Sequence, residues 1–321
     1  MGVRAFAIKV VTSDASILLD PSCALGPVPH FPNPHPFEYW ALQDANRRIL
    51  EAAAGTEIAI ISHFHQDHYK PPLTNWIYNG SSRAIFNQIF QGRLIYAKDP
   101  AVSMGSNQRN RARELQRALR QVKGTLVSCD AQCFEWGGTA LQFSPPLPHG
   151  ARGSPQGWVI ATCISEGEDR FCVCPDVQGP TENVTLQWIV DQAPTELAIG
   201  GPPLYLPASK FSEQQRAAFF QNLDLLSKIC KKIVLDHHIF RNTSGVHIFC
   251  QQQRELSNQQ CLLCNFAEQG GARENFFEAQ REMLYEKYPA SVEFLNWVAS
   301  PKTQRQRVPP PIPPELPNLT D

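Results

Sequence analysis

The chain lacks a long hydrophobic run and an excess of charge of either sign. Its 321 residues carry a formal net charge of −1, and charged residues make up 18% of the sequence. A near-neutral chain exerts no overall attraction on nucleic acid or on an anionic membrane surface. No apolar run approaches the ~18 residues of a membrane span. With 42% hydrophobic residues, the chain is long enough to bury a large core as one α/β domain.

The first residues also lack the features of a secretion signal. The segment 1–10 has no long apolar stretch and no small-residue cleavage site, and Phe6 breaks the myristoylation pattern that Met1-Gly2 would suggest. Without a secretion signal, the ten cysteines are expected to be reduced core residues. Cys261 and Cys264 form a lone Cys-x-x-Cys without a second pair, which does not favour a structural zinc site. We therefore expect a cytoplasmic protein.

The most informative segment is His63-Phe64-His65-Gln66-Asp67-His68, which follows the apolar run 58–61. Three imidazoles and a carboxylate in six positions are costly to bury without strong partners. Imidazole and carboxylate ligands suit zinc, iron or manganese better than calcium or magnesium. His-x-His places two ring nitrogens on one side of an extended loop, so both reach one ion, while Asp67 and His68 point toward a second. A polar surface loop is the alternative, but a metal pair accounts for all four side chains.

Further histidines and aspartates occur where strand-like runs end. They are Asp20, which is followed by Pro21, then His149, Asp176, and the adjacent His237 and His238. Each of them alone could be an ordinary loop or turn residue. Together with the hexad 63–68 they indicate a site assembled from several strand ends.

The hexad and the order of these residues resemble the signature of the metallo-β-lactamase superfamily. Within it, the strings Leu19-Asp20-Pro21, Asp176-Val177-Gln178-Gly179-Pro180 and Leu235-Asp236-His237-His238 resemble an uncharacterised, largely archaeal family of predicted metal-dependent hydrolases. The resemblance covers roughly residues 1–290. It implies an α/β fold of four layers, an αββα metallo-β-lactamase-like sandwich, and a hydrolase whose substrate is not settled.

The resemblance also implies a set of metal ligands. His63, His65 and His149 would hold the first metal, while Asp67, His68 and either His237 or His238 would hold the second, with Asp176 bridging the two. The metals would be two divalent ions, zinc in first place, with iron or manganese as alternatives. Such a pair turns a shared water into hydroxide at neutral pH and neutralises the charge that develops during attack.

Three more side chains receive roles in the reaction. Asp67 would orient the nucleophile or move its proton, and Asp20 would accept a hydrogen bond from a ligand histidine and fix its ring. His35 is a candidate substrate-binding residue; a loop histidine packed on Trp40 is the alternative.

Periodicity predicts the remaining organisation. We expect a hairpin at 6–11 and 17–20, and later strands at 57–62, 94–97, 125–128, 139–143, 158–163, 170–174, 196–199 and 233–236. Helices are expected at 36–54, 107–122, 181–191, 212–230 and 273–287. Residues 1–300 would form a single domain, and the proline-rich residues 301–321 a disordered tail.

These observations predict a binuclear metal-dependent hydrolase of a small ester, lactone, thioester or phosphodiester. A nuclease or phosphodiesterase acting on nucleic acid is one alternative, because Arg109, Arg113 and Arg117 recur every four positions on a predicted helix. An ordinary solvated helix face explains the same arginines. A second alternative is a non-hydrolytic, iron-binding redox protein.

Overall fold

Two β-sheets form the centre of the molecule. The computed structural model describes residues 2–26, 33–257 and 260–317. The first sheet has the order β2 (Ile8–Val11), β3 (Ser16–Leu19), β5 (Ile58–Ile61), β6 (Leu94–Ala97) and β7 (Thr125–Ser128). The second has the order β16 (Leu262–Cys264), β15 (Lys232–Asp236), β14 (Glu196–Gly200), β13 (Asp169–Cys174), β12 (Thr162–Glu166), β9 (Thr139–Phe143) and β8 (Cys133–Trp136). Two short pairs, β1 (Arg4–Ala5) with β4 (Cys23–Ala24) and β10 (Leu147–Pro148) with β11 (Trp158–Val159), lie outside both sheets.

The two sheets pack face to face because their strands are apolar on both sides. In β5, Ile58 and Ile60 belong to the core between the sheets, while Ala59 and Ile61 belong to the core on the outer face. In β13, Val173 faces the other sheet, whereas Cys172 and Cys174 face outward. Successive side chains of a strand point to opposite faces, so this alternation gives each sheet two buried surfaces.

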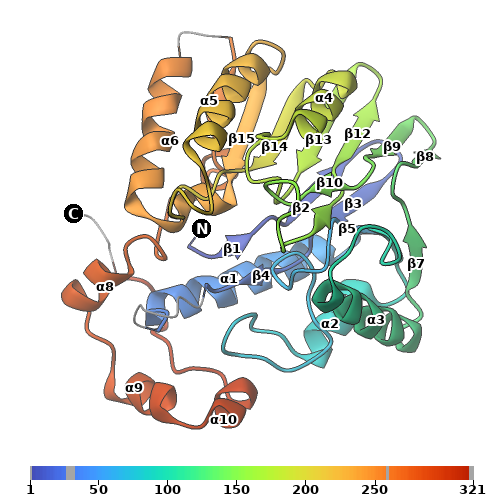
Figure 1. Cartoon of the computed structure of the whole chain (residues 1–321). Coiled ribbons are helices and arrows are strands. Elements are labelled where there is room, and N and C mark those ends of the chain that lie inside the picture. The colour runs from blue at the N-terminus through green and yellow to red at the C-terminus, as the bar shows by residue number, and fades with distance from the viewer. Residues whose placement is uncertain (1, 27–32, 258–259, 318–321) are drawn as a thin grey trace.

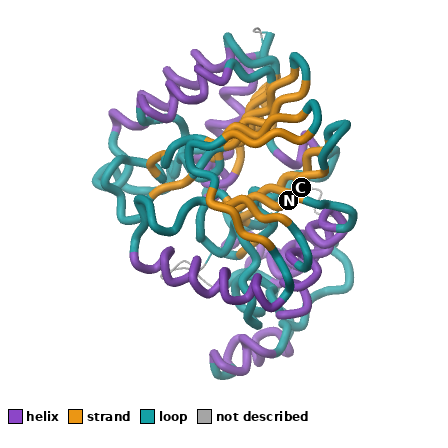
Figure 2. The backbone as a smooth tube through the Cα atoms, turned by 90° about the vertical axis from the view of Figure 1, so that its right-hand side faces the viewer, coloured by secondary structure: helices purple, strands orange, loops and turns teal. Residues whose placement is uncertain are grey.

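Helices cover the two outer faces. The first sheet is covered by α1 (Pro36–Ala53), α2 (Arg83–Phe90) and α3 (Ser106–Gln121), and the second by α4 (Asn183–Gln192), α5 (Glu213–Ser227) and α6 (Thr243–Leu256). Figure 2 shows the strands in the interior with helices outside them. The predicted four-layer αββα sandwich is therefore confirmed. Among the described residues, no helix is both long enough and apolar enough to cross a membrane.

Helix α1 begins where its sequence provides a cap. Nδ1 of His35 accepts a hydrogen bond from the backbone N–H of Phe37, and the carboxylate of Glu38 accepts one from the backbone N–H of His35. Pro36 occupies the first turn, where its missing N–H costs nothing. This reciprocal cap fixes the point at which the chain enters the outer layer.

Several elements differ from the sequence prediction. The helix expected at 273–287 is present only as α8 (Arg281–Lys287). The residues before it are not helical because Phe276 packs on Phe240 and Phe277 packs on Phe37, in two separate places. Helices α2, α6, α7 (Phe266–Gln269) and α9 (Val292–Ala299), the 3₁₀ helix η1 (His237–Arg241), and strands β8 and β16 were not predicted.

The proline-rich tail also differs from the prediction of disorder, as far as it is described. Residues 302–307 form α10 (Lys302–Arg307), at the lower edge of Figure 1. Trp297 Nε1 donates to the carbonyl oxygen of Val308 at 2.9 Å, and Ile312 packs on the core beneath α1. These contacts give the segment an apolar surface against which to order. Residues 318–321 lie outside the described part of the chain, and the domain boundary at residue 300 stays a prediction.

Candidate metal centre

The predicted ligands lie at one edge of the sandwich, where parallel strands of both sheets end. In the first sheet β3 leads into Asp20 and β5 into the segment 63–68, and in the second β13 leads toward Asp176 and β15 into His237. The carboxyl ends of parallel strands meet at one edge, which is where ligands bind in sheets of this kind. All eight side chains predicted as ligands fall into three overlapping groups whose ligand atoms lie within 4.8 Å of one another.

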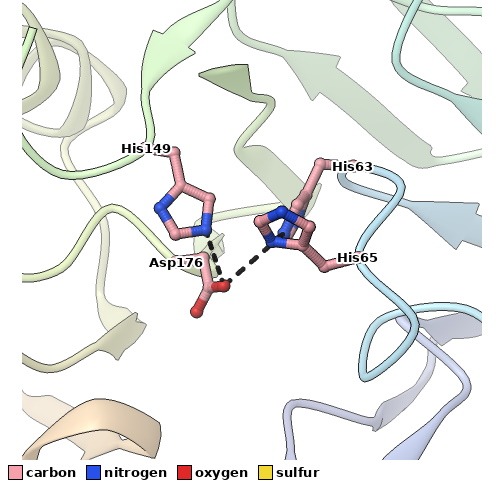
Figure 3. A group of neighbouring side chains, drawn as sticks. All are labelled: His63, His65, His149 and Asp176. Atoms are coloured by element: carbon pink, nitrogen blue, oxygen red, sulfur yellow. Dashed lines mark hydrogen bonds and ion pairs between the residues drawn. The ribbon is translucent and has the colours of Figure 1, made fainter. Parts of the chain in front are cut away.

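The first group consists of His63, His65, His149 and Asp176 (Figure 3). Nε2 of His149 lies 2.9 Å from Oδ2 of Asp176, and Nε2 of His63 lies 3.5 Å from the same oxygen. Nδ1 of His65 lies 3.0 Å from Nε2 of His63. The three rings come from two loops and converge on one carboxylate, so this group could hold one ion.

The second group consists of Asp67, His68 and His237. Oδ2 of Asp67 lies 3.6 Å from Nε2 of His237, and Nε2 of His68 lies 3.2 Å from Oδ2 of Asp176. This group lies beside the first, and His68 and His237 also face Asp176 of the first group. It could hold a second ion.

Asp176 lies between the groups. Its Oδ2 faces His63, His68 and His149, while its Oδ1 lies 3.1 Å from Nε2 of His237 and 3.3 Å from Nε2 of His238. Two oxygens of one carboxylate thus face nitrogens on opposite sides. This is the position of a ligand shared by two ions.

The donor atoms of these groups lack other partners. Six buried side-chain atoms at this site have no hydrogen-bond partner: Nε2 of His68, both ring nitrogens of His149, Oδ1 of Asp176, Nδ1 of His237 and Nε2 of His238. A buried polar atom without a partner costs about 1–3 kcal/mol. Divalent cations at this place would satisfy most of these atoms, so the residues fit the metal pair that the resemblance implies.

The protonation states also suit a cation. Burial, followed by the nearby rings, lowers the pKa of His63, and burial with His149 lowers the pKa of His65 to about 3, so both are neutral. Although burial opposes its ionisation, the surrounding histidines, His237 first, hold the pKa of Asp176 well below its usual range. Metal ligation requires neutral imidazole and ionised carboxylate. His68 is the exception: burial lowers its pKa, but Asp176 and Asp20 together hold it well above its usual value.

His237 and His238 occupy different positions. Both approach Asp176, but only His237 belongs to the group with Asp67 and His68. Nδ1 of His238 instead lies 3.2 Å from the hydroxyl oxygen of Tyr205, whose ring is stacked on it. This geometry favours His237 over His238 as the candidate third ligand of the second group.

Three residues at this edge have a left-handed backbone conformation. Asp20, Asp176 and His237 have φ angles of 43°, 49° and 73°. A left-handed conformation of a residue other than glycine is uncommon and costs of the order of 1 kcal/mol or more. Strain at three strand ends that meet at one place indicates a functional site.

His35 is not part of this site. Its Nδ1 caps α1, and its Nε2 lies 2.8 Å from the carbonyl oxygen of Tyr288. The ring packs edge-on against Phe37 and Tyr285 rather than on Trp40. One ring nitrogen of His35 holds the start of α1 and the other contacts Tyr288, and substrate binding by His35 stays a prediction.

Sequence reasoning did not identify Tyr205 and Arg241, which line the site. Arg241 is the last residue of η1, and Tyr205 lies in the loop that follows β14. A usable signal was the pair Gly200-Gly201: a Cβ at Gly200 would lie 2.7 Å from the backbone nitrogen of Asp176. Such close backbone approach places the loop after β14 against the ligand loops.

The arginines of α3 remain at the surface. Arg109, Arg113 and Arg117 are exposed, while Ala112, Leu115 and Ala118 between them are buried against the first sheet. This is the pattern of an amphipathic surface helix. Binding of nucleic acid by these arginines stays a prediction.

Comparison with known proteins gives clear sequence relatives. No family model matches the chain. A UPF0282 protein of Methanopyrus kandleri is 31% identical over 284 residues, which cover 88% of this chain and 95% of that protein. A UPF0282 protein of Thermococcus onnurineus is 34% identical over 250 residues, which cover 78% of this chain and 82% of that protein.

Solved structures resemble the chain more distantly. CmlA, a diiron β-hydroxylase from Streptomyces venezuelae, aligns with a TM-score of 0.46 and 10% identity, over 81% of this chain and 51% of that protein. A diphosphatase from the PhnP family aligns with a TM-score of 0.39 and 11% identity, over 81% of each chain.

Proposed function

This chain belongs to the UPF0282 family, and we propose that it is a binuclear metal-dependent hydrolase of a small ester, lactone, thioester or phosphodiester. One observation carries the proposal. Imidazole nitrogens of five histidines lie within 3.5 Å of the two carboxylate oxygens of Asp176. Metal binding accounts for so many buried nitrogen atoms without hydrogen-bond partners around one carboxylate.

We assign the ligands as follows. His63, His65 and His149 would hold the first metal, Asp67, His68 and His237 the second, and Asp176 both. His238 would stand beside the second ion as a substitute or additional ligand. When bound, two divalent ions supply a strong nucleophile from water at neutral pH and stabilise the negative charge that develops in the transition state.

The remaining chemistry belongs to the side chains. Although burial disfavours its charge, His68 and His237 lower the pKa of Asp67, so its carboxylate is ionised and can orient a water molecule and receive its proton. Asp20 is buried and belongs to none of the groups of candidate ligands. Its carboxylate instead accepts hydrogen bonds from His68 and from both the backbone and the hydroxyl of Ser62. Asp20 is thus a positioning residue.

Zinc is the metal that we propose, with iron or manganese as alternatives. The donor set contains imidazoles and carboxylates and no thiolate, which all three metals accept. The ten cysteines are all free, and nine of them are at least partly buried. Free thiols are typical of a reducing compartment, so we place the protein in the cytoplasm.

The test begins with metal content and turnover of the same protein. We expect about two zinc ions per chain by elemental mass spectrometry, and zinc-dependent hydrolysis of at least one substrate class in a panel of the four. The double variant His63→Ala/His65→Ala should lose at least one ion and all turnover. The exposed His247 of α6 offers a matched control, and His247→Ala should retain both properties.

Other outcomes decide between the alternatives. Zinc-loaded protein without turnover on any class would contradict the proposal. Two iron ions with an oxygen-dependent absorption spectrum would favour the redox protein. RNA binding that falls steeply between ~50 and ~200 mM salt, and is lost when Arg109, Arg113 and Arg117 become glutamine, would favour the nuclease.

A further inference from the structure

Arg241 reaches the metal centre from the turn that presents two of its ligands. It ends η1, the 3₁₀ helix that begins at His237. Its Nη2 lies 3.2 Å from Nε2 of His237, and its Nη1 donates to the hydroxyl oxygen of Tyr205 at 2.9 Å. The guanidinium carbon lies 5.8 Å from the centre of the Tyr205 ring. The guanidinium is thus fixed in place beside His237.

Arg241 has no counter-ion among the described residues, although carboxylates are close by. Glu278 receives two hydrogen bonds from Arg4, one of them 2.9 Å long from Nε to Oε2. Glu38 receives two hydrogen bonds of 2.7 Å from Arg281. In residues 2–26, 33–257 and 260–317, no carboxylate oxygen lies within 4.0 Å of a nitrogen of Arg241. Glu278 and Glu38 are thus already paired with other arginines, while Asp67 and Asp176 face His237.

Its donors are incompletely used. Nε of Arg241 is buried and has no hydrogen-bond partner. If Nε2 of His237 binds a metal, it no longer accepts a hydrogen bond from Nη2 of Arg241. A guanidinium has five N–H donors in a planar fork and is always charged. Nε and Nη2 of Arg241 could therefore both donate hydrogen bonds to an anionic acceptor.

The same residue borders open space. Arg241 lines a cavity of about 50 Å³ together with His237, Asp236 and Arg4, and a larger one of about 550 Å³ together with Glu278 and Arg281. The side chain therefore lies between the metal ligands and space that a small molecule can enter. Its charge also reaches the ligands: after burial, Arg241 is the main cause that lowers the pKa of His238.

We propose that Arg241, oriented by Tyr205, binds an oxyanion of the substrate beside the two metals, so that the substrates are anionic. This inference rests on the proposed function and narrows it to phosphodiesters or to esters that carry a carboxylate. Guanidinium groups bind both oxyanions through two parallel hydrogen bonds, and charge-assisted bonds of this kind are roughly twice as strong as neutral ones. A neutral ester or lactone would leave the Arg241 charge without an acceptor, which selects against it.

The experiment measures binding, so that it does not depend on turnover. Dimethyl phosphate, an anion, and trimethyl phosphate, its neutral analogue, are titrated into zinc-loaded protein and followed by ³¹P NMR. Acetate is then added as a competitor for dimethyl phosphate. The variants are Arg241→Gln, Arg241→Lys, which keeps the charge, and Arg113→Gln, the same change at an exposed arginine of α3.

We expect Arg241→Gln to bind dimethyl phosphate about 10- to 100-fold more weakly than the wild type, with no change for trimethyl phosphate. Arg241→Lys should retain part of the affinity, and Arg113→Gln all of it. The competition compares the affinity of acetate with that of dimethyl phosphate. If acetate binds more tightly than dimethyl phosphate in the wild type, and this preference is lost in Arg241→Gln, the oxyanion is a carboxylate. Both results support the inference.

Two results overturn it. Equal affinities in Arg241→Gln and Arg113→Gln, at equal zinc content, mean that Arg241 binds no anion. Loss of zinc from both Arg241→Gln and Arg241→Lys means that Arg241 only supports His237. Anion binding that depends on Arg241 in a protein without hydrolytic activity would refute the proposed function while the anion site stands.

Discussion

Oδ2 of Asp20 lies 2.7 Å from Nδ1 of His68, and this contact sets the direction of the opposite ring nitrogen. The carboxylate is itself held by Ser62, whose backbone N–H donates to Oδ1 at 2.8 Å and whose hydroxyl donates to Oδ2 at 2.7 Å. Nε2 of His68 is therefore presented to Asp176. Asp20, which lies outside the three groups of candidate ligands, thus orients a member of the second group.

Asp20→Asn should weaken binding of the second metal. The amide is a poorer acceptor than the carboxylate and does not favour one tautomer of His68, so we expect about 10- to 100-fold lower affinity for one of the two zinc ions. Zinc titration with a competing chelator measures this. Asp191→Asn, the same change at an exposed aspartate of α4, should leave both affinities unchanged; an unaltered Asp20→Asn titration would contradict the assignment.

Removal of the metals should lower the thermal stability. A ligand that binds only the folded state, at a free concentration about 1,000 times its Kd, stabilises by about 4 kcal/mol. For a chain of this size we expect a chelator to lower the Tm by roughly 5–15 °C. Differential scanning calorimetry with and without zinc tests this, and the His63→Ala/His65→Ala variant should show a much smaller difference. Equal Tm values for wild type with and without zinc would contradict a tightly held metal pair.

Gly200→Ala should disturb Asp176 through the backbone. The added Cβ would lie 2.7 Å from the backbone nitrogen of Asp176, closer than real Cβ contacts. We expect a loss of about 1–3 kcal/mol of unfolding free energy and reduced zinc content. At Gly138 a Cβ would meet only a flexible carboxylate at 3.4 Å, so Gly138→Ala should change neither. Urea denaturation and elemental analysis of both variants decide the point.

The ion pair between Arg4 and Glu278 should make stability depend on pH. Burial favours the neutral acid, but the hydrogen bonds from Arg4 hold the pKa of Glu278 below its ordinary value of 4.5. A group with a lowered pKa stabilises the fold above its unfolded-state pKa, and this stabilisation is lost as the pH falls through the folded-state value. Glu278→Gln should therefore cost about 1–3 kcal/mol near pH 7 and progressively less below about pH 4.5.

Urea midpoints from pH 7 to pH 3 measure this difference between wild type and variant. Glu282→Gln, at the neighbouring exposed glutamate of α8, should give a small difference that does not change with pH. A Glu278→Gln difference that is equally large at pH 3 would show that packing rather than charge is responsible.

The described part of the tail should contribute to stability. Ile312 packs on the core beneath α1 and is partly buried, so Ile312→Ala should cost about 1–2 kcal/mol. Val308 is 46% exposed, and Val308→Ala should cost less than about 0.5 kcal/mol. Chemical denaturation compares the two; equal small effects would mean that the segment 308–312 adds little to the fold.

Much of the fold, and the grouping of the candidate ligands at one edge, could be predicted from the sequence, because both depend on local patterns. Apolar runs predicted most strands between β2 and β15, with β4, β8 and β10 as exceptions, and the histidines and aspartates lie directly where those runs end. The helix expected at 273–287 was shortened by packing of Phe276 and Phe277 on distant aromatic rings. No local pattern contains that information.

Contacts with residues distant in the sequence also decide the roles of His35 and Arg241. His35 looks like a functional loop histidine, but its role depends on a helix that begins beside it and on the distant Tyr288. Arg241 looks like any surface arginine, and only the folded chain shows its contacts with His237 and Tyr205. Tertiary partners, rather than residue type, decide both cases.

The ligand loops come from both sheets, and this has a consequence for how the protein is made. Asp67 and His68 leave the ribosome long before Asp176 and His237, and the first half of the chain contains no complete group of the candidate ligands. With the ligands assigned above, a nascent chain could not complete its metal pair before the second sheet is made. Metal loading would then be a late event in biogenesis, and a product truncated before Asp176 would lack the shared ligand.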